Sequence, residues 1–138
     1  MIHHEATKDT KDTKERGLVV SHAVIGAALE VHRHLGPGLL ESAYEAALCQ
    51  ELWLRRVGFE RQVPVRIVYK GQLLAAAVRL DLVVEQSVVV EVKAVEELAA
   101  IHRSQLVTYL KVTGYQVGLL INFNVRLLRH GMRRVLVG

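Results

Sequence analysis

Cysteine is almost absent from this sequence: the 138 residues contain only Cys49. A single cysteine excludes an intrachain disulfide, and nothing points to an oxidising compartment, so we expect an intracellular, cytoplasmic protein. Without a second cysteine, a structural zinc site is not indicated. Cys49 lies within a stretch of helical pattern and is interpreted as a small core residue.

Long hydrophobic runs and aromatic residues are also scarce. The longest apolar runs, such as Leu73 to Val78, fall far short of the roughly 20 residues that a membrane-spanning helix needs. The start of the chain is too polar for a secretory signal, so no membrane association is expected. Aromatic residues make up 5% of the chain, which gives little support to a surface that stacks the bases of single-stranded nucleic acid.

What the chain does contain is enough apolar material for one core, because 51% of its residues are hydrophobic. The formal net charge is +4, which suits a polyanionic partner such as DNA or RNA without requiring one. Basic residues form two groups that are candidates for phosphate contacts or for an ordinary solvated surface. They are Arg55, Arg56, Arg61 and Arg66 in one group, and Arg126, Arg129, His130, Arg133 and Arg134 in the other.

The N-terminal half reads as a tail followed by two helices. Residues 1–16 carry a charged repeat without apolar periodicity, which predicts a flexible tail before a single domain over residues 17–138. Apolar residues at spacings of three and four predict a helix over 18–35, ended by Gly36-Pro37-Gly38. A second helix is predicted from about residue 40 to Gly58, with Glu45 off its apolar side.

The remainder alternates between strand and helix patterns. Strands are predicted over residues 59–69, 73–84 and 88–95, with a turn at Lys70-Gly71-Gln72. A helix is predicted over 96–113, a buried strand over 115–123 and an edge strand over 132–137. The order α-α-β-β-β-α-β-β predicts an α/β fold with a mixed β-sheet flanked by helices.

The segment Val88 to Lys93 places two charged side chains in a strand that otherwise reads as buried. Residues two apart in a strand point to the same face, so Glu91 and Lys93 project together. Asp81 adds a carboxylate from the preceding strand. Buried carboxylates persist when they are paired, hydrogen-bonded or bound to metal. Asp81, Glu91 and Lys93 therefore predict a pocket for Mg²⁺ or Mn²⁺; the alternative is a simple Glu91–Lys93 ion pair on a solvated sheet face.

Taken together, these motifs resemble the PD-(D/E)XK nuclease superfamily, with its restriction-endonuclease-like core. More narrowly, the segment Gly38 to Tyr44 resembles the signature of the GxxExxY proteins. The resemblance covers roughly residues 18–137 and departs from the superfamily label in having Leu80, not proline, before Asp81. Its further motifs are Arg61-Gln62-Val63-Pro64, Asp81-Leu82-Val83-Val84, Glu91-Val92-Lys93-Ala94, Gln105-Leu106-Val107-Thr108-Tyr109-Leu110 and Gly118-Leu119-Leu120-Ile121-Asn122-Phe123.

The resemblance implies a role for each site residue. Asp81 and Glu91 are metal ligands, Lys93 is the catalytic lysine, Glu41 is a helix-borne acid that completes the site, and Gln105 faces the metal. Each helix residue has an alternative: Glu41 in the first turn of a helix is favourable to the helix dipole, and Gln105 is able to serve as a backbone partner only. Tyr44 is interpreted as a core residue with a hydrogen-bonded hydroxyl.

Three functional hypotheses follow from these observations. The first is a metal-dependent nuclease that hydrolyses phosphodiesters of DNA or RNA. The second is a non-hydrolytic module that binds nucleic acid or protein through a nuclease fold, with a targeting protein partner. The third, compatible with both, is a homodimer formed through the apolar final strand.

Overall fold

The computed structural model describes residues 6–138, and its element order confirms the predicted succession of helices and strands. One short 3₁₀ helix is added before the final strand. The elements are α1 (Ala6–Leu35), α2 (Glu41–Leu54), β1 (Phe59–Tyr69), β2 (Gln72–Val84), β3 (Val88–Lys93), α3 (Ala100–Thr113), β4 (Val117–Asn122), η1 (Leu128–Gly131) and β5 (Met132–Leu136).

All five strands form one mixed sheet in the order β1-β2-β3-β4-β5. Only β3 and β4 run parallel; the other neighbours are antiparallel. A parallel pair needs a crossover connection, and α3 supplies it between β3 and β4. The predicted mixed sheet flanked by helices is therefore confirmed.

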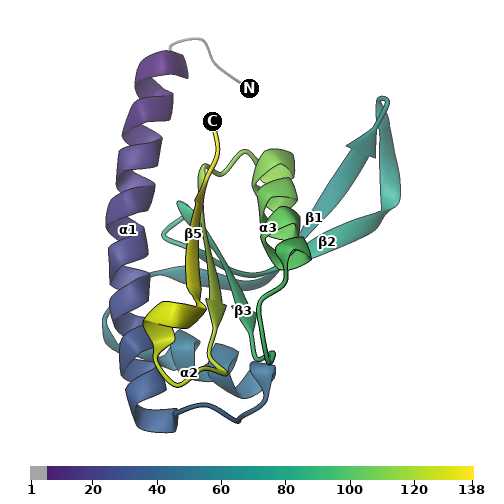
Figure 1. The fold of residues 1–138 in the computed structure, drawn as a ribbon. Helices are drawn as coiled ribbons and strands as arrows, with labels where there is room; N and C mark the ends of the chain where they lie inside the picture. The colour runs from purple at the N-terminus through teal and green to yellow at the C-terminus, as the bar shows by residue number, and fades with distance from the viewer. Residues whose placement is uncertain (1–5) are drawn as a thin grey trace.

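Helices cover both faces of the sheet and create two layers of core (Figure 1). Val88, Val90 and Val92 of β3 pack in the cluster beneath α1 and α2, whereas Val89 packs in the cluster beneath α3. This alternation follows from the strand period of two. Because β3 is covered on both faces, a charged side chain on it is forced into a buried position.

The start of α1 corrects the predicted tail. Residues 6–16, which the charge pattern assigned to a flexible tail, continue the helix, while residues 1–5 lie outside the described part of the chain. Lys and Glu are good helix formers, and side chains near residue 16 bond to distant segments. Arg16 Nε donates to Ser87 Oγ at 3.0 Å, and Lys14 Nζ donates to the Gly138 carbonyl at 3.0 Å.

The β1–β2 hairpin extends beyond the sheet that the other strands form. Strand β2 pairs with β3 only through Leu82, Val83 and Val84, although its pairing with β1 continues to Gln72. The hairpin therefore projects from the body, toward the right of Figure 1. Lys70 and Gly71 form its turn with φ of 48° and 80°, as predicted from the Lys-Gly-Gln segment.

No helix in the described part of the chain is long and apolar enough to cross a membrane. Strand β5 is an edge of the sheet, as predicted, and exposes both Arg133 and Arg134.

Candidate metal centre

The candidate site lies at the fork where β2 and β3 separate. Backbone pairing between the two strands ends at Leu82 and Val90. Beyond it, the backbone amide of Asp81 donates to Glu91 Oε2 at 2.9 Å, and the amide of Val92 donates to Asp81 Oδ2 at 2.8 Å. The two carboxylates thus replace the missing strand-to-strand hydrogen bonds and are held side by side.

A kink in β2 shapes this fork. Leu82 packs in the core beneath α1 and α2, whereas Leu80, two residues earlier, packs in the core beneath α3. Residues two apart in a regular strand share a face, so the alternation is interrupted at Asp81. On β1, Gln62 has a φ of 54° and lies between the residues that pair with Leu80 and Leu82.

Burial raises the pKa of both carboxyl groups. Glu91 is only 6% exposed, and its burial, together with the negative charge of Asp81, raises its pKa to about 8. Burial also raises the pKa of Asp81; the hydrogen bond from Val92 opposes this change, and the charge of Glu45 adds to it. Without a cation, the fork therefore favours a protonated Glu91 near neutral pH.

Lys93 ends β3 on the same side of the strand as Glu91 and is partly buried. Its positive charge lowers the pKa of both carboxyl groups against the larger effect of burial. The backbone holds it in place, because the amide of Phe123 donates to the Lys93 carbonyl at 3.0 Å. The alternative of a solvated Glu91–Lys93 ion pair does not fit, since Glu91 is buried and the ion pairs of residues 6–138 do not include this one.

Glu41 is the first residue of α2 and is exposed. It lies near enough for its charge to contribute to raising the pKa of both Asp81 and Glu91, after burial in each case. Its place in the first turn of α2 also suits the helix dipole. A role in helix stability and a role at the edge of the site are therefore compatible for Glu41. In the described residues no hydrogen bond joins Glu41 to the fork.

On α3, Tyr109 lies within range of the charges of both carboxylates. Burial raises the pKa of Tyr109, and the charges of Glu91 and Asp81 raise it further. Gln105 lies one turn earlier on α3 and is exposed, with no hydrogen bond to the fork among residues 6–138. His102 has a capping role, because its Nδ1 accepts a hydrogen bond of 3.0 Å from the amide of Ala99.

Glu45 is a buried acid, contrary to its predicted place off the apolar side of α2. It is only 5% exposed. Arg61 Nε donates to Glu45 Oε2 at 2.6 Å, and Gln62 Nε2 lies 3.0 and 2.9 Å from the two carboxylate oxygens. Its position four residues after Glu41 places both acids on one helical face, but because Glu41 is exposed, this spacing does not indicate that Glu45 is buried.

The loop before Glu41 is built by the remainder of the glycine-glutamate-tyrosine motif. The Tyr44 hydroxyl donates to the Gly36 carbonyl at 2.5 Å and accepts from the Leu39 amide at 3.0 Å. Its ring stacks on Phe123 with centroids 4.7 Å apart and 7° between the planes. Gly38 has a φ of 102°, which favours glycine. Tyr44 is thus a core residue with a hydrogen-bonded hydroxyl, as predicted.

Asn122, at the end of β4, holds the chain that follows Lys93. Its side chain accepts from the Val95 amide at 3.0 Å and donates to the Val95 carbonyl at 2.9 Å. These bonds fix an irregular segment, so α3 begins at Ala100 and not near residue 96 as predicted. Together with the Phe123 amide, they give Lys93 a rigid position.

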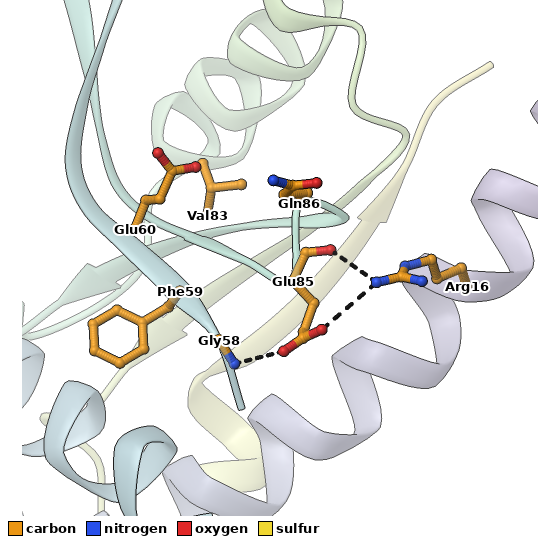
Figure 2. Close-up of a pocket in the computed structure, with 7 residues that line it drawn as sticks. All are labelled: Arg16, Gly58, Phe59, Glu60, Val83, Glu85 and Gln86. Carbon is orange, nitrogen blue, oxygen red and sulfur yellow. Dashed lines mark hydrogen bonds and ion pairs between the residues drawn. The ribbon is translucent and has the colours of Figure 1, made fainter. Parts of the chain in front are cut away.

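A hollow at the other end of β2 has a structural explanation. Figure 2 shows Glu85 between the Gly58 amide, which donates to Oε2 at 2.5 Å, and Arg16, whose Nη2 lies 3.6 Å from Oε1. These contacts join α1 to the β2–β3 turn and to the start of β1. The hollow is separate from the fork, and two of its charged groups, Arg16 and Glu85, are already paired with each other.

The donor set of the fork fits a hard divalent cation. Each carboxylate has one oxygen that accepts the backbone hydrogen bond described above, and the second oxygens, Asp81 Oδ1 and Glu91 Oε1, have no hydrogen-bond partner within residues 6–138. No three His, Cys, Asp or Glu side chains in that range converge into a complete cage. Mg²⁺ suits such a site, because it binds through one or two carboxylates and keeps several waters.

The fold and this geometry agree with the comparison with known families. No curated protein and no solved structure matches the chain. The family model of the PD-(D/E)XK nuclease superfamily, however, matches residues 19–135, which include the C-terminal part of α1, all of α2, the sheet except the last residue of β5, and the fork. The chain belongs to the PD-(D/E)XK nuclease superfamily.

Proposed function

We propose that this protein is a metal-dependent phosphodiesterase that cleaves nucleic acid at the β2–β3 fork. The observation that carries the proposal is the pair of carboxylates, Asp81 and Glu91, fixed by reciprocal backbone hydrogen bonds of 2.9 and 2.8 Å in a buried place. A structural role would be served by uncharged residues at lower cost, because the burial of two neighbouring acids is unfavourable without a cation.

Asp81 and Glu91 would hold Mg²⁺ or Mn²⁺ through their second oxygens. When bound, the ion supplies Lewis acidity that makes a water molecule more acidic and offsets the charge of a phosphate. Lys93 lies on the side of Glu91 and is suited to orient the attacking water or to accept its proton. Glu41 adds negative charge at the rim of the site, and Gln105 is assigned to substrate or water contacts from α3.

Two finer assignments accompany this proposal. We place the chain in the GxxExxY group of the superfamily, because Gly38, Glu41 and Tyr44 have the expected spacing and Tyr44 builds the loop that carries Glu41. We also assign it to a reducing, cytoplasmic compartment, since its one cysteine, Cys49, is buried and unpaired.

Calorimetric titration of Mg²⁺ and Mn²⁺, next to a cleavage assay on single- and double-stranded DNA and RNA, tests the function. We expect the wild type to bind an ion and to cleave at least one substrate. Asp81→Asn with Glu91→Gln should lose both properties, whereas Lys93→Met should keep ion binding and lose cleavage by about 100-fold or more. Glu60→Gln, an exposed acid of β1, is the matched control and should keep both.

Three results would count against the proposal in different ways. Absence of ion binding by the wild type would reject the metal site. Ion binding without cleavage of any of the four substrates would favour the non-hydrolytic binding module. Cleavage that persists in the doubly substituted protein would place the chemistry elsewhere.

A further inference from the structure

The projecting hairpin has two chemically different faces. Val63 and Val65 of β1 pack against the core beneath α3, and Val65 is paired directly with Val78 of β2. Directly paired residues lie on the same face, so this face is apolar. By alternation, the intervening pairs, Pro64 with Arg79 and Arg66 with Ala77, lie on the opposite face, the one toward α2.

The α2-facing side of the hairpin carries a row of arginines. Arg61 pairs with Leu82, which packs beneath α1 and α2, and it bonds to Glu45 of α2. Arg66 and Arg79 follow on the same side, and both are exposed. Among the paired hairpin residues assigned to this face no carboxylate is present. The part of this face between Arg61 and Arg66 is thus basic, with Arg61 paired to Glu45 and with Arg66 and Arg79 exposed, and it suits the spaced negative charges of a phosphate backbone.

At the base of this row lies a hollow with an exposed indole. The hollow, about 550 Å³ in volume, is lined by Ala46, Cys49, Gln50, Trp53, Phe59 and Arg61. Trp53 is 67% exposed and also borders a second hollow beside Arg56. Tryptophan is highly buried on average, so an exposed indole between two hollows and beside guanidinium groups is an unusual surface feature that is accessible to a ligand.

Arg61 connects the hollow to the fork. The same side chain lines the hollow and donates to the buried Glu45, whose charge acts on Asp81. A nucleic-acid strand lying along the arginine row would therefore pass the hollow on the α2 side of the sheet, next to the Arg61–Glu45 pair. An unpaired base is able to stack on the Trp53 indole, whereas the bases of an intact duplex are already stacked on one another.

Resting on the proposed nuclease function, we propose that this surface selects single-stranded nucleic acid. An unpaired base stacks on Trp53 in the hollow, and the adjoining phosphates contact Arg66 and Arg79. The low aromatic content of the sequence gives little support to a base-stacking surface. One exposed tryptophan next to a basic strand face is, however, enough to stack a single base.

Trp53 is the only tryptophan of the chain, so its fluorescence reports on this site directly. The wild type is titrated in EDTA, where a metal-dependent reaction stops, with 15-nucleotide oligo(dT), oligo(rU) and a 15-base-pair DNA duplex. We expect saturable quenching by a single strand and weaker binding of the duplex at equal salt. The two oligonucleotides decide between DNA and RNA. Quenching by neither single strand overturns the inference.

Variants are compared by anisotropy of a labelled single strand. Trp53→Ala should weaken binding on the order of tenfold, the loss typical of one stacked base, and Trp53→Phe should restore most of it. Arg66→Ala with Arg79→Ala should weaken binding and reduce its dependence on salt. Val19→Ala, an exposed apolar residue of α1, and Arg129→Ala, an exposed arginine of η1, are the matched controls.

The two proposals fail in distinguishable ways. A protein that cleaves in Mg²⁺, but whose Trp53→Ala variant binds single strands as tightly as the wild type, overturns this inference alone. If the protein binds single strands at Trp53 but cleaves no substrate, the single-strand-binding surface is supported and the proposed nuclease activity is rejected. An equal loss of binding in Arg129→Ala would attribute the affinity to overall charge and overturn the assignment of the hairpin.

Discussion

The backbone amide of Asp81 donates a hydrogen bond of 2.9 Å to the carboxylate of Glu91 across the β2–β3 fork. The reciprocal bond runs from the amide of Val92 to Asp81. Each carboxylate thus takes the place of a hydrogen bond between the two strands and is also a candidate metal ligand. Stability and ion binding are therefore linked through the same two groups, and the link has measurable consequences.

The stability of the metal-free protein should fall as the pH rises. Glu91 has a pKa of about 8 in the folded protein and about 4.5 when unfolded, so the folded state holds the extra proton between these values. The stabilisation is complete below pH 4.5 and is lost as the pH rises to about 8. Asp81, with its pKa also raised, acts in the same direction. Urea unfolding in EDTA at pH 5 and pH 8.5 measures the difference.

Glu91→Gln isolates this effect, because the amide keeps a carbonyl acceptor for the Asp81 backbone and does not titrate. We expect a flatter pH profile and, at pH 8.5, a gain of roughly a few kcal/mol over the metal-free wild type. Glu60→Gln, on exposed β1 surface, should leave the profile unchanged. Parallel profiles for wild type and Glu91→Gln would contradict the raised pKa.

Ion affinity should increase with pH over the same range. A bound divalent ion requires ionised carboxylates, so binding releases the proton held by Glu91. Below pH 8, protonation of Glu91 alone should lower the apparent affinity for Mg²⁺ or Mn²⁺ about tenfold for each unit by which the pH decreases. Calorimetry in two buffers of different ionisation enthalpy measures the proton released. An affinity independent of pH between 6 and 8 would show that Glu91 is not a ligand.

Much of the fold and the core of the site could be predicted from the sequence, because both depend on local periodicity. The strand period placed Glu91 and Lys93 on one side, and the buried character of β3 followed from its run of valines. The burial of Glu45 was not predictable in this way, since it depends on Arg61 and Gln62, which reach α2 only because β1 departs from regular geometry at Gln62. Nor does periodicity show that Trp53 stands exposed beside Arg61.

The extent of α1 was missed for a similar reason. In a charged segment without apolar periodicity, the helix propensity of Lys and Glu alone is not enough to predict a stable helix. In the fold, contacts with the β2–β3 turn and the C-terminal end hold it, through Arg16 to Ser87 and Lys14 to Gly138. Tertiary contacts thus override the local pattern.

Tyr44→Phe should destabilise the protein although its ring remains. The substitution preserves the stacking on Phe123 and removes the two hydrogen bonds to Gly36 and Leu39. We expect a loss of about 1–3 kcal/mol in the free energy of unfolding, because the partners in the loop are left unpaired. Tyr69→Phe, at an exposed residue near the hairpin turn, should have little effect in the same urea titration.

Two glycines of α1 should respond in opposite ways to alanine. A Cβ at Gly17 would lie 2.6 Å from Val117 Cγ2, a buried side chain of β4, with the Ser87 carbonyl also near at 3.4 Å. Alanine at this position forces α1 away from the sheet. A Cβ at Gly26 would lie 3.2 Å from Arg55 Nη1, the far end of a flexible side chain that is able to move aside.

Because alanine is the better helix former by about 1 kcal/mol, Gly26→Ala should stabilise the protein by up to that amount. Gly17→Ala gains the same propensity but should lose more, on the order of 1–3 kcal/mol, through the displacement of Val117. Thermal and urea unfolding of both variants measure the difference. If Gly17→Ala were also stabilising, the close packing of α1 on β4 would be contradicted, and residues 6–16 would have to be held by their own helical propensity instead.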